Sequence, residues 1–181
     1  MCAWTSRNIS NVDVPDCKKW SWRTPMTLSS REVDFIAYDE RGQPVLLVEV
    51  KGRHKKTSEL WAARFRRNLL AHGTLPKAPY FLIATPERMY FWRQDDQNPE
   101  EELPQFTMDA TDELKPYFEK SDQTPGKTSG QALELILFSW LNDIAEFGQS
   151  RAKEDPSLRW LSESGLLDAL KRARIELSVV Q

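Results

Sequence analysis

The sequence predicts a mixed α/β (α+β) domain in which helices flank a central sheet. Three observations lead to this prediction. Residues 32–51 hold two β-rich runs around a turn, and residues 79–85 and 88–93 are short apolar runs typical of buried strands. Residues 131–147 carry an apolar stripe at helical spacing. The order of hairpin, helix, strand, strand and further helices is that of a sheet covered by helices.

The overall composition limits the classes of protein to consider. The chain has 181 residues, of which 40% are hydrophobic and 29% charged, enough for one domain with a core. A net charge of −2 excludes nucleic-acid binding through overall basic charge. Two cysteines and two histidines cannot form a zinc site of the usual spacing. The start of the chain has no apolar signal-peptide core, and no stretch is long and apolar enough to span a membrane, so we expect a soluble cytoplasmic protein.

The first elements of the predicted core form a β-hairpin. Residues 1–30 are a poorly defined N-terminal segment without clear periodicity. Residues 32–38 are expected to form the first strand, and residues 39–44 a turn in which Gly42 supplies positive φ. The second strand, residues 45–51, begins with apolar side chains on both faces. That pattern is typical of a central strand covered on both sides.

The rest of the predicted core, residues 31–120, is expected to contain a helix from Thr57 to His72 with Gly73 as its C-cap. The two apolar strands follow. A short helix broken by Pro116 is expected near the end of the core.

Residues 121–181 are predicted to be a C-terminal helical extension packed on the core. A linker precedes a helix over residues 131–147. Thr128 and Gln131 fit a capping box at the start of this helix, and Gly148 is expected to end it. One more helix, passing into a short strand, is expected after it.

The hairpin carries the candidate catalytic residues. Side chains alternate along a strand, so Glu49 and Lys51 share one face. A turn centred between Arg41 and Gly42 places Asp34 opposite Glu49, and two carboxylates then converge beside a lysine. A slip of one residue in register would separate them. Buried carboxylates repel, and a divalent cation such as Mg²⁺ relieves that repulsion. The alternative is a Glu49–Lys51 salt bridge with no catalytic role.

Asp34, fourteen intervening residues and then Glu49-Val50-Lys51 resemble the D…ExK signature of the PD-(D/E)xK nuclease superfamily. The stretch REVDFIAYDERGQPVLLVEVKGR is most similar to the amino-terminal nuclease domain of type I restriction enzyme motor subunits and to related free-standing domains. The resemblance covers about residues 31–94. It implies a restriction-endonuclease-like fold, Mg²⁺ (or Mn²⁺) held by Asp34, Glu49 and the carbonyl of Val50, and Lys51 serving the attacking water. The implied activity is that of an endonuclease hydrolysing DNA phosphodiester bonds.

One feature of the resembling family has no counterpart at the start of this chain. The family core usually begins with a helix that often carries a further acidic residue. Residues 1–30 contain only Asp13 and Asp16 as acids, with room for one or two helical turns over residues 16–23.

A local excess of basic residues follows the hairpin. Between residues 51 and 67, seven Lys or Arg stand against one acid, Glu59. The candidate phosphate contacts are Arg53, Lys55, Lys56, Arg64 and Arg67. The alternative is a solvated helix flank. DNA is the expected partner, with a homodimer or a larger restriction or repair partner as further candidates and no membrane.

Two other functions remain open from the sequence. One is a catalytically inactive module of nuclease fold that binds nucleic acid or protein. The other is an unrelated α/β protein in which the hairpin is purely structural.

Overall fold

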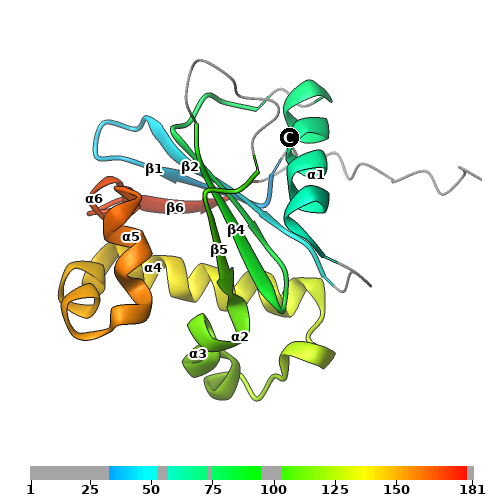
Figure 1. Ribbon diagram of the computed structural model, residues 1–181. Helices are drawn as coiled ribbons and strands as arrows, with labels where there is room; N and C mark the ends of the chain where they lie inside the picture. The colour runs from blue at the N-terminus through cyan, green and yellow to red at the C-terminus, as the bar shows by residue number, and fades with distance from the viewer. Residues whose placement is uncertain (1–32, 53–56, 73–74, 95–102, 179–181) are drawn as a thin grey trace, which may run out of the picture.

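The computed structural model describes residues 33–52, 57–72, 75–94 and 103–178 (Figure 1). The N-terminal segment, including the expected turns at 16–23, and the Gly73 cap lie outside the described residues.

A single mixed sheet forms the centre of the molecule. Its strand order is β5-β4-β3-β2-β1-β6; β2 and β3 are parallel, and the other neighbours are antiparallel. The strands are β1 (Phe35–Tyr38), β2 (Pro44–Val50), β3 (Tyr80–Ala84), β4 (Arg88–Arg93), β5 (Phe106–Asp109) and β6 (Arg174–Leu177). The predicted mixed α/β (α+β) class is confirmed at this level.

The β1–β2 hairpin has the register that the sequence predicted. Phe35 pairs with Val48, and the next two pairs follow in step; the register shifts only after Ala37, next to the turn. Gly42 has a φ of +76°, as the turn requires. The Asp39 carboxylate accepts from two main-chain N–H groups of the turn, at 2.9 and 2.8 Å. An Asx-type turn therefore fixes the hairpin geometry.

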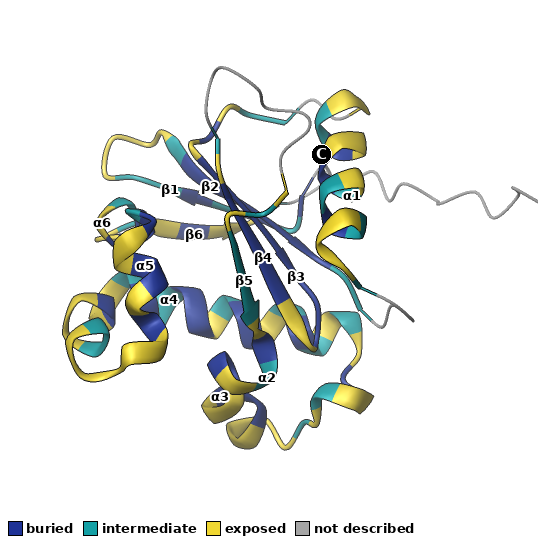
Figure 2. Ribbon diagram, viewed as in Figure 1, coloured by how far each residue is buried: buried dark blue, intermediate teal, exposed yellow. Residues whose placement is uncertain are grey.

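Strand β2 is central and covered on both faces. Its last six residues are all buried. Helix α1 (Glu59–His72) covers one face, where Leu47 packs with Ala62 and Leu69. Helix α4 (Gly130–Glu154) covers the other, where Leu46 and Val48 lie in the larger core cluster (Figures 1 and 2).

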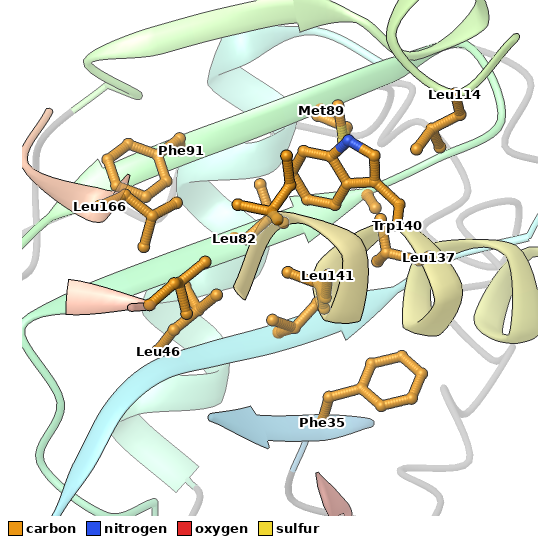
Figure 3. Packing of buried hydrophobic residues seen from close by; sticks show 14 of the residues in the cluster. Phe35, Leu46, Leu82, Met89, Phe91, Leu114, Leu137, Trp140, Leu141 and Leu166 are labelled. Atoms are coloured by element: carbon orange, nitrogen blue, oxygen red, sulfur yellow. The ribbon is translucent and has the colours of Figure 1, made fainter. Parts of the chain in front are cut away.

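The larger core cluster lies between the sheet and α4. Figure 3 shows Trp140, Leu137 and Leu141 of α4 packed against side chains from several strands, including Phe35 and Leu82. Both Trp140 and Leu82 have no exposed surface. A 25-residue helix gains most of its stability from such an apolar face.

The region after β4 differs in detail from the prediction. Strand β5 was not predicted. The expected short helix is two helices, α2 (Ala110–Glu113) and α3 (Lys115–Lys120); the break falls at Leu114, and Pro116 lies in the first turn of α3 instead of at the break. Asp109 caps α2 by accepting from the Thr111 N–H at 2.9 Å.

Both predicted ends of α4 are wrong. Ser129, not Thr128, is the N-cap, and its Oγ accepts from the Ala132 N–H at 3.2 Å. Thr128 is buried, and its hydroxyl donates to the Thr124 carbonyl at 2.7 Å. This bond spans the short 3₁₀ turn η2 (Pro125–Lys127). Gly148 does not end the helix but lies buried inside it, where its missing side chain makes room for Leu167.

The single helix expected near the end of the chain is several short elements. They are the 3₁₀ turn η3 (Pro156–Leu158), α5 (Arg159–Glu163) and α6 (Leu166–Ala169). Gly165, with a φ of +79°, separates α5 from α6. Strand β6 then pairs with β1, so residues 121–181 also contribute an edge strand to the sheet. No helix in the described ranges is long and apolar enough to cross a membrane.

Candidate active site

Asp34 lies at a bend one residue before β1 and joins the end of the hairpin. Its main-chain N–H donates to the carbonyl of Val48 at 3.0 Å. Its side-chain Oδ2 accepts from the main-chain N–H of Val50 at 2.6 Å. The Asp34 carboxylate therefore takes the place of a strand partner for the last residue of β2.

The peptide after Val50 orients a second oxygen towards this edge of β2. The Lys51 N–H donates to the carbonyl of Ala84 in β3, at 2.8 Å. In a trans peptide the preceding carbonyl points the opposite way. The carbonyl of Val50 therefore points away from β3, towards the side of β2 on which Asp34 lies.

Glu49 and Lys51 lie on the α1 face of the sheet, as alternation along β2 predicts. Glu49 is 5% exposed. Its Oε1 forms an ion pair with the Lys51 ammonium, which also lies 5.0 Å from the centre of the Phe65 ring on α1. The Lys51 side chain is 34% exposed, so solvent reaches the pair from the lysine end.

The surroundings of Glu49 favour its neutral form. Burial is the main cause that raises the pKa of Glu49 to about 7, and the negative charge of Asp34 acts in the same direction. Lys51 acts in the opposite direction through its charge and its hydrogen bond. A carboxyl group that releases its proton near neutrality is suited to bind a cation when one arrives.

A third acidic side chain, Glu134, is part of this electrostatic environment and was missed from the sequence. Its charge also raises the pKa of Glu49. Helix α4 brings it close because the helix begins against the end of β2: a Cβ on Gly52 would lie 3.5 Å from Gly130. No sequence signal links a residue of α4 to the hairpin, since the contact arises only in the fold.

The candidate phosphate contacts are only partly placed. Arg53, Lys55 and Lys56 lie outside the described residues. Arg64 and Arg67 are exposed on α1. Arg66 between them is 3% exposed and lies over the rings of Phe81 and Trp92, at 5.8 and 5.4 Å. Helix α1 thus directs one arginine inwards and two to solvent.

The donor set at the end of β2 fits a hard divalent cation with few protein ligands. Two carboxylates, Asp34 and Glu49, and the carbonyl of Val50 are oxygen donors from adjacent positions of one hairpin. Mg²⁺ typically binds through one or two carboxylates and completes its shell with water and substrate oxygens. Across the parts of the chain that the structure describes, no three Asp, Glu, His or Cys side chains group closely enough to hold a metal ion. A cation here would therefore depend on the main-chain oxygen and on water.

The chain matches no protein-family model, no curated protein and no solved structure in the comparisons made.

Proposed function

We propose that this chain is a Mg²⁺- or Mn²⁺-dependent endonuclease of restriction-endonuclease-like fold that hydrolyses DNA phosphodiester bonds. The observation that carries the proposal is the hydrogen bond from the Val50 N–H to Asp34. That bond supports the pairing of Asp34 with the Glu49-Val50-Lys51 stretch that the resemblance requires.

The arrangement of elements around the hairpin also supports the proposal. A hairpin leads into helix α1, and α1 leads into β3, which lies parallel to β2. The resemblance predicts hairpin, helix and strand in this order. Because β2 and β3 are parallel, the carboxyl end of β2, where Glu49 and Lys51 lie, is beside that of β3.

The proposed roles of the residues follow from their positions. Asp34, Glu49 and the carbonyl of Val50 would hold the cation, which when bound lowers the pKa of a coordinated water and stabilises negative charge on the phosphate. Lys51 is partly exposed and its ammonium is carried by four methylene groups with rotatable bonds, so it could turn from Glu49 to the attacking water or a phosphate oxygen. The water oxygen bonds to phosphorus as the bond from phosphorus to the leaving oxygen breaks, and the proton that the water loses is balanced by the proton that the leaving oxygen takes up from solvent.

Helix α1 supplies the proposed phosphate contacts that the structure places. Arg64 and Arg67 are exposed on the helix that packs over Lys51 through Phe65. Arginine binds phosphate through two parallel hydrogen bonds. These contacts position a duplex or a single strand without reading its sequence.

Cleavage assays on plasmid and single-stranded DNA with Mg²⁺ or Mn²⁺ test the proposal. We expect Glu49→Gln and Lys51→Ala each to reduce cleavage by at least about a hundredfold, since such groups contribute two to four orders of magnitude. Lys120→Ala and Glu119→Gln, both exposed on α3, are the matched controls. Equal cleavage in all of these proteins would show a contaminating nuclease. DNA binding without cleavage in the unaltered protein would favour the catalytically inactive module.

A further inference from the structure

A second buried acidic group, Glu113, lies where three helices meet and takes no part in the proposed chemistry. Glu113 is the last residue of α2 and is 8% exposed. Trp140 of α4 and Trp160 of α5 are buried beside it, and their rings stack at 6.4 Å with an angle of 15° between planes. The group therefore lies in the apolar layer between the sheet and the C-terminal helices.

Three polar atoms in this cluster are buried without a hydrogen bond of ordinary geometry. They are Oε1 of Glu113 and the indole nitrogens of Trp140 and Trp160. The two indole N–H groups nevertheless face the carboxyl closely enough to lower its pKa. Figure 3 shows the indole nitrogen of Trp140 turned towards Met89 and Leu114, the residue after Glu113.

Charged groups around Glu113 do not neutralise it. Asp155, the C-cap of α4, raises its pKa, and Arg151 lowers it. Arg151 donates to the Tyr117 hydroxyl at 2.8 Å, and that hydroxyl donates to Asp143 at 2.7 Å. Burial outweighs these effects and raises the pKa of Glu113 to about 7, while burial and Asp143 keep Tyr117 protonated by raising its pKa to about 12.

We propose that Glu113 is a proton-operated latch that fastens α2 to α4 and α5. With its proton, the carboxyl is neutral and fits the apolar layer between the two indoles. Without it, a charge lies in that layer with an acidic neighbour, Asp155, and hydration of the charge requires α2 to move away from α4 and α5. The latch is closed in mildly acidic solution and loosens as the pH rises through neutrality.

The latch acts on the helix that reaches the candidate active site. Trp140 and Gly130 belong to the same helix, and Gly130 abuts Gly52, one residue after Lys51. The proposed contact therefore joins α2 to the helix whose first residue abuts the candidate active site. The proposal holds whether or not the chain is a nuclease.

Side-chain NMR of the two tryptophans in the full chain tests the latch. The indole ¹H–¹⁵N signals, assigned with Trp140→Phe and Trp160→Phe, are followed from about pH 5 to about pH 9. We expect both signals to shift with a common midpoint near neutrality. Signals that do not move over this range, or that move with separate midpoints, overturn the proposal, and this measurement needs no variant of Glu113 that folds.

Glu113→Gln keeps the shape of the side chain and removes the titration. We expect its indole signals to be independent of pH, and the matched exposed variant Glu119→Gln to behave like the unaltered chain. We also expect hydrogen-exchange protection of α2 and α3, corrected for intrinsic rates, to fall at least about tenfold between mildly acidic and mildly alkaline solution unless Glu113 is replaced. The same fall in Glu113→Gln would assign the change to another group and overturn the latch.

Discussion

The main-chain N–H of Val50 donates a hydrogen bond of 2.6 Å to Oδ2 of Asp34. The bond joins the residue just before β1 to the last residue of β2, at the open end of the hairpin. Bonds from a main-chain N–H to a carboxylate are among the stronger hydrogen bonds in proteins. The position of Asp34 beside Glu49 thus depends on a specific bond as well as on strand register.

Replacing Asp34 should therefore affect both stability and cation binding. We expect Asp34→Asn to keep part of the bond to Val50 and to lower the free energy of unfolding by about 1 kcal/mol, and Asp34→Ala by about 2 kcal/mol. Both should weaken Mn²⁺ binding, measured by calorimetry, at least about tenfold. Asp39→Asn, in the hairpin turn, changes a carboxylate remote from the end of β2 and should leave Mn²⁺ affinity unchanged. Unaltered Mn²⁺ affinity in Asp34→Ala would remove Asp34 from the proposed ligands.

Glu49 should make stability depend on pH in a defined direction. Its pKa is raised from the ordinary 4.5 to about 7, so the folded state holds a proton that the unfolded state releases. The stabilisation is fully present below pH 4.5 and is lost as the pH rises through about 7. Relative to the unaltered chain, Glu49→Gln should gain up to about 3 kcal/mol at mildly alkaline pH and nothing in acid. Denaturant unfolding of both proteins at several pH values measures this; a gain of equal size at every pH would argue against titration of Glu49.

The affinity for a divalent cation should also depend on the proton held by Glu49. Protons and the cation compete for the same carboxyl. Mn²⁺ affinity should therefore decrease as the pH is lowered below neutrality, by up to about tenfold per pH unit, and should be constant above neutrality. Calorimetry in buffers of different ionisation enthalpy counts the proton released on binding. In Glu49→Gln this release should disappear.

Arg64 and Arg67 should contribute to DNA binding through phosphate contacts alone. Each replacement by Ala should weaken binding to all DNA sequences alike and reduce the slope of log affinity against log salt by about 1. Fluorescence anisotropy with labelled DNA at several salt concentrations measures the slope. Arg159→Ala on α5, also exposed, is the matched control. If all three variants change the slope equally, the binding is diffuse and α1 is not the interface.

The N-terminus of α4 should depend on Ser129 more than on Thr128 as a cap. Ser129→Ala removes the bond to the Ala132 N–H and should lower the free energy of unfolding by about 1 kcal/mol, and Ser129→Asp should restore most of it. Asp at position 128 would place a charge at a buried site and should not cap the helix. Chemical denaturation distinguishes these variants, and rescue by Thr128→Asp would show that the cap can shift.

The hairpin and the two apolar strands could be predicted because their signals are local. The apolar run of β2, the turn residues around Gly42 and the apolar runs at β3 and β4 each specify their own structure. The register of the hairpin followed from the turn, and with it the pairing of Asp34 with the strand of Glu49. The resemblance pointed to the same residues.

The parts that could not be predicted depend on distant contacts. A short strand was expected where β6 lies, but its pairing with β1 was not, and β5 was not expected at all. Both strands are four residues long and mostly not buried, so neither has a clear period. The choice of Ser129 over Thr128 as cap follows from the burial of Thr128, and the continuation of α4 through Gly148 follows from packing against Leu167. Glu134 and Glu113 gain their environments from elements far away in the chain.

The pairing of β6 with β1 has a consequence for how the protein is made. Phe35 lies opposite Leu177, so the strand beside Asp34 obtains its outer neighbour only after nearly all of the described chain has left the ribosome. Until then the hairpin has an open edge that another chain can join. Contacts so distant in sequence also slow folding, because a long loop must close before they form. Nascent chains should therefore need protection from association until the last strand arrives.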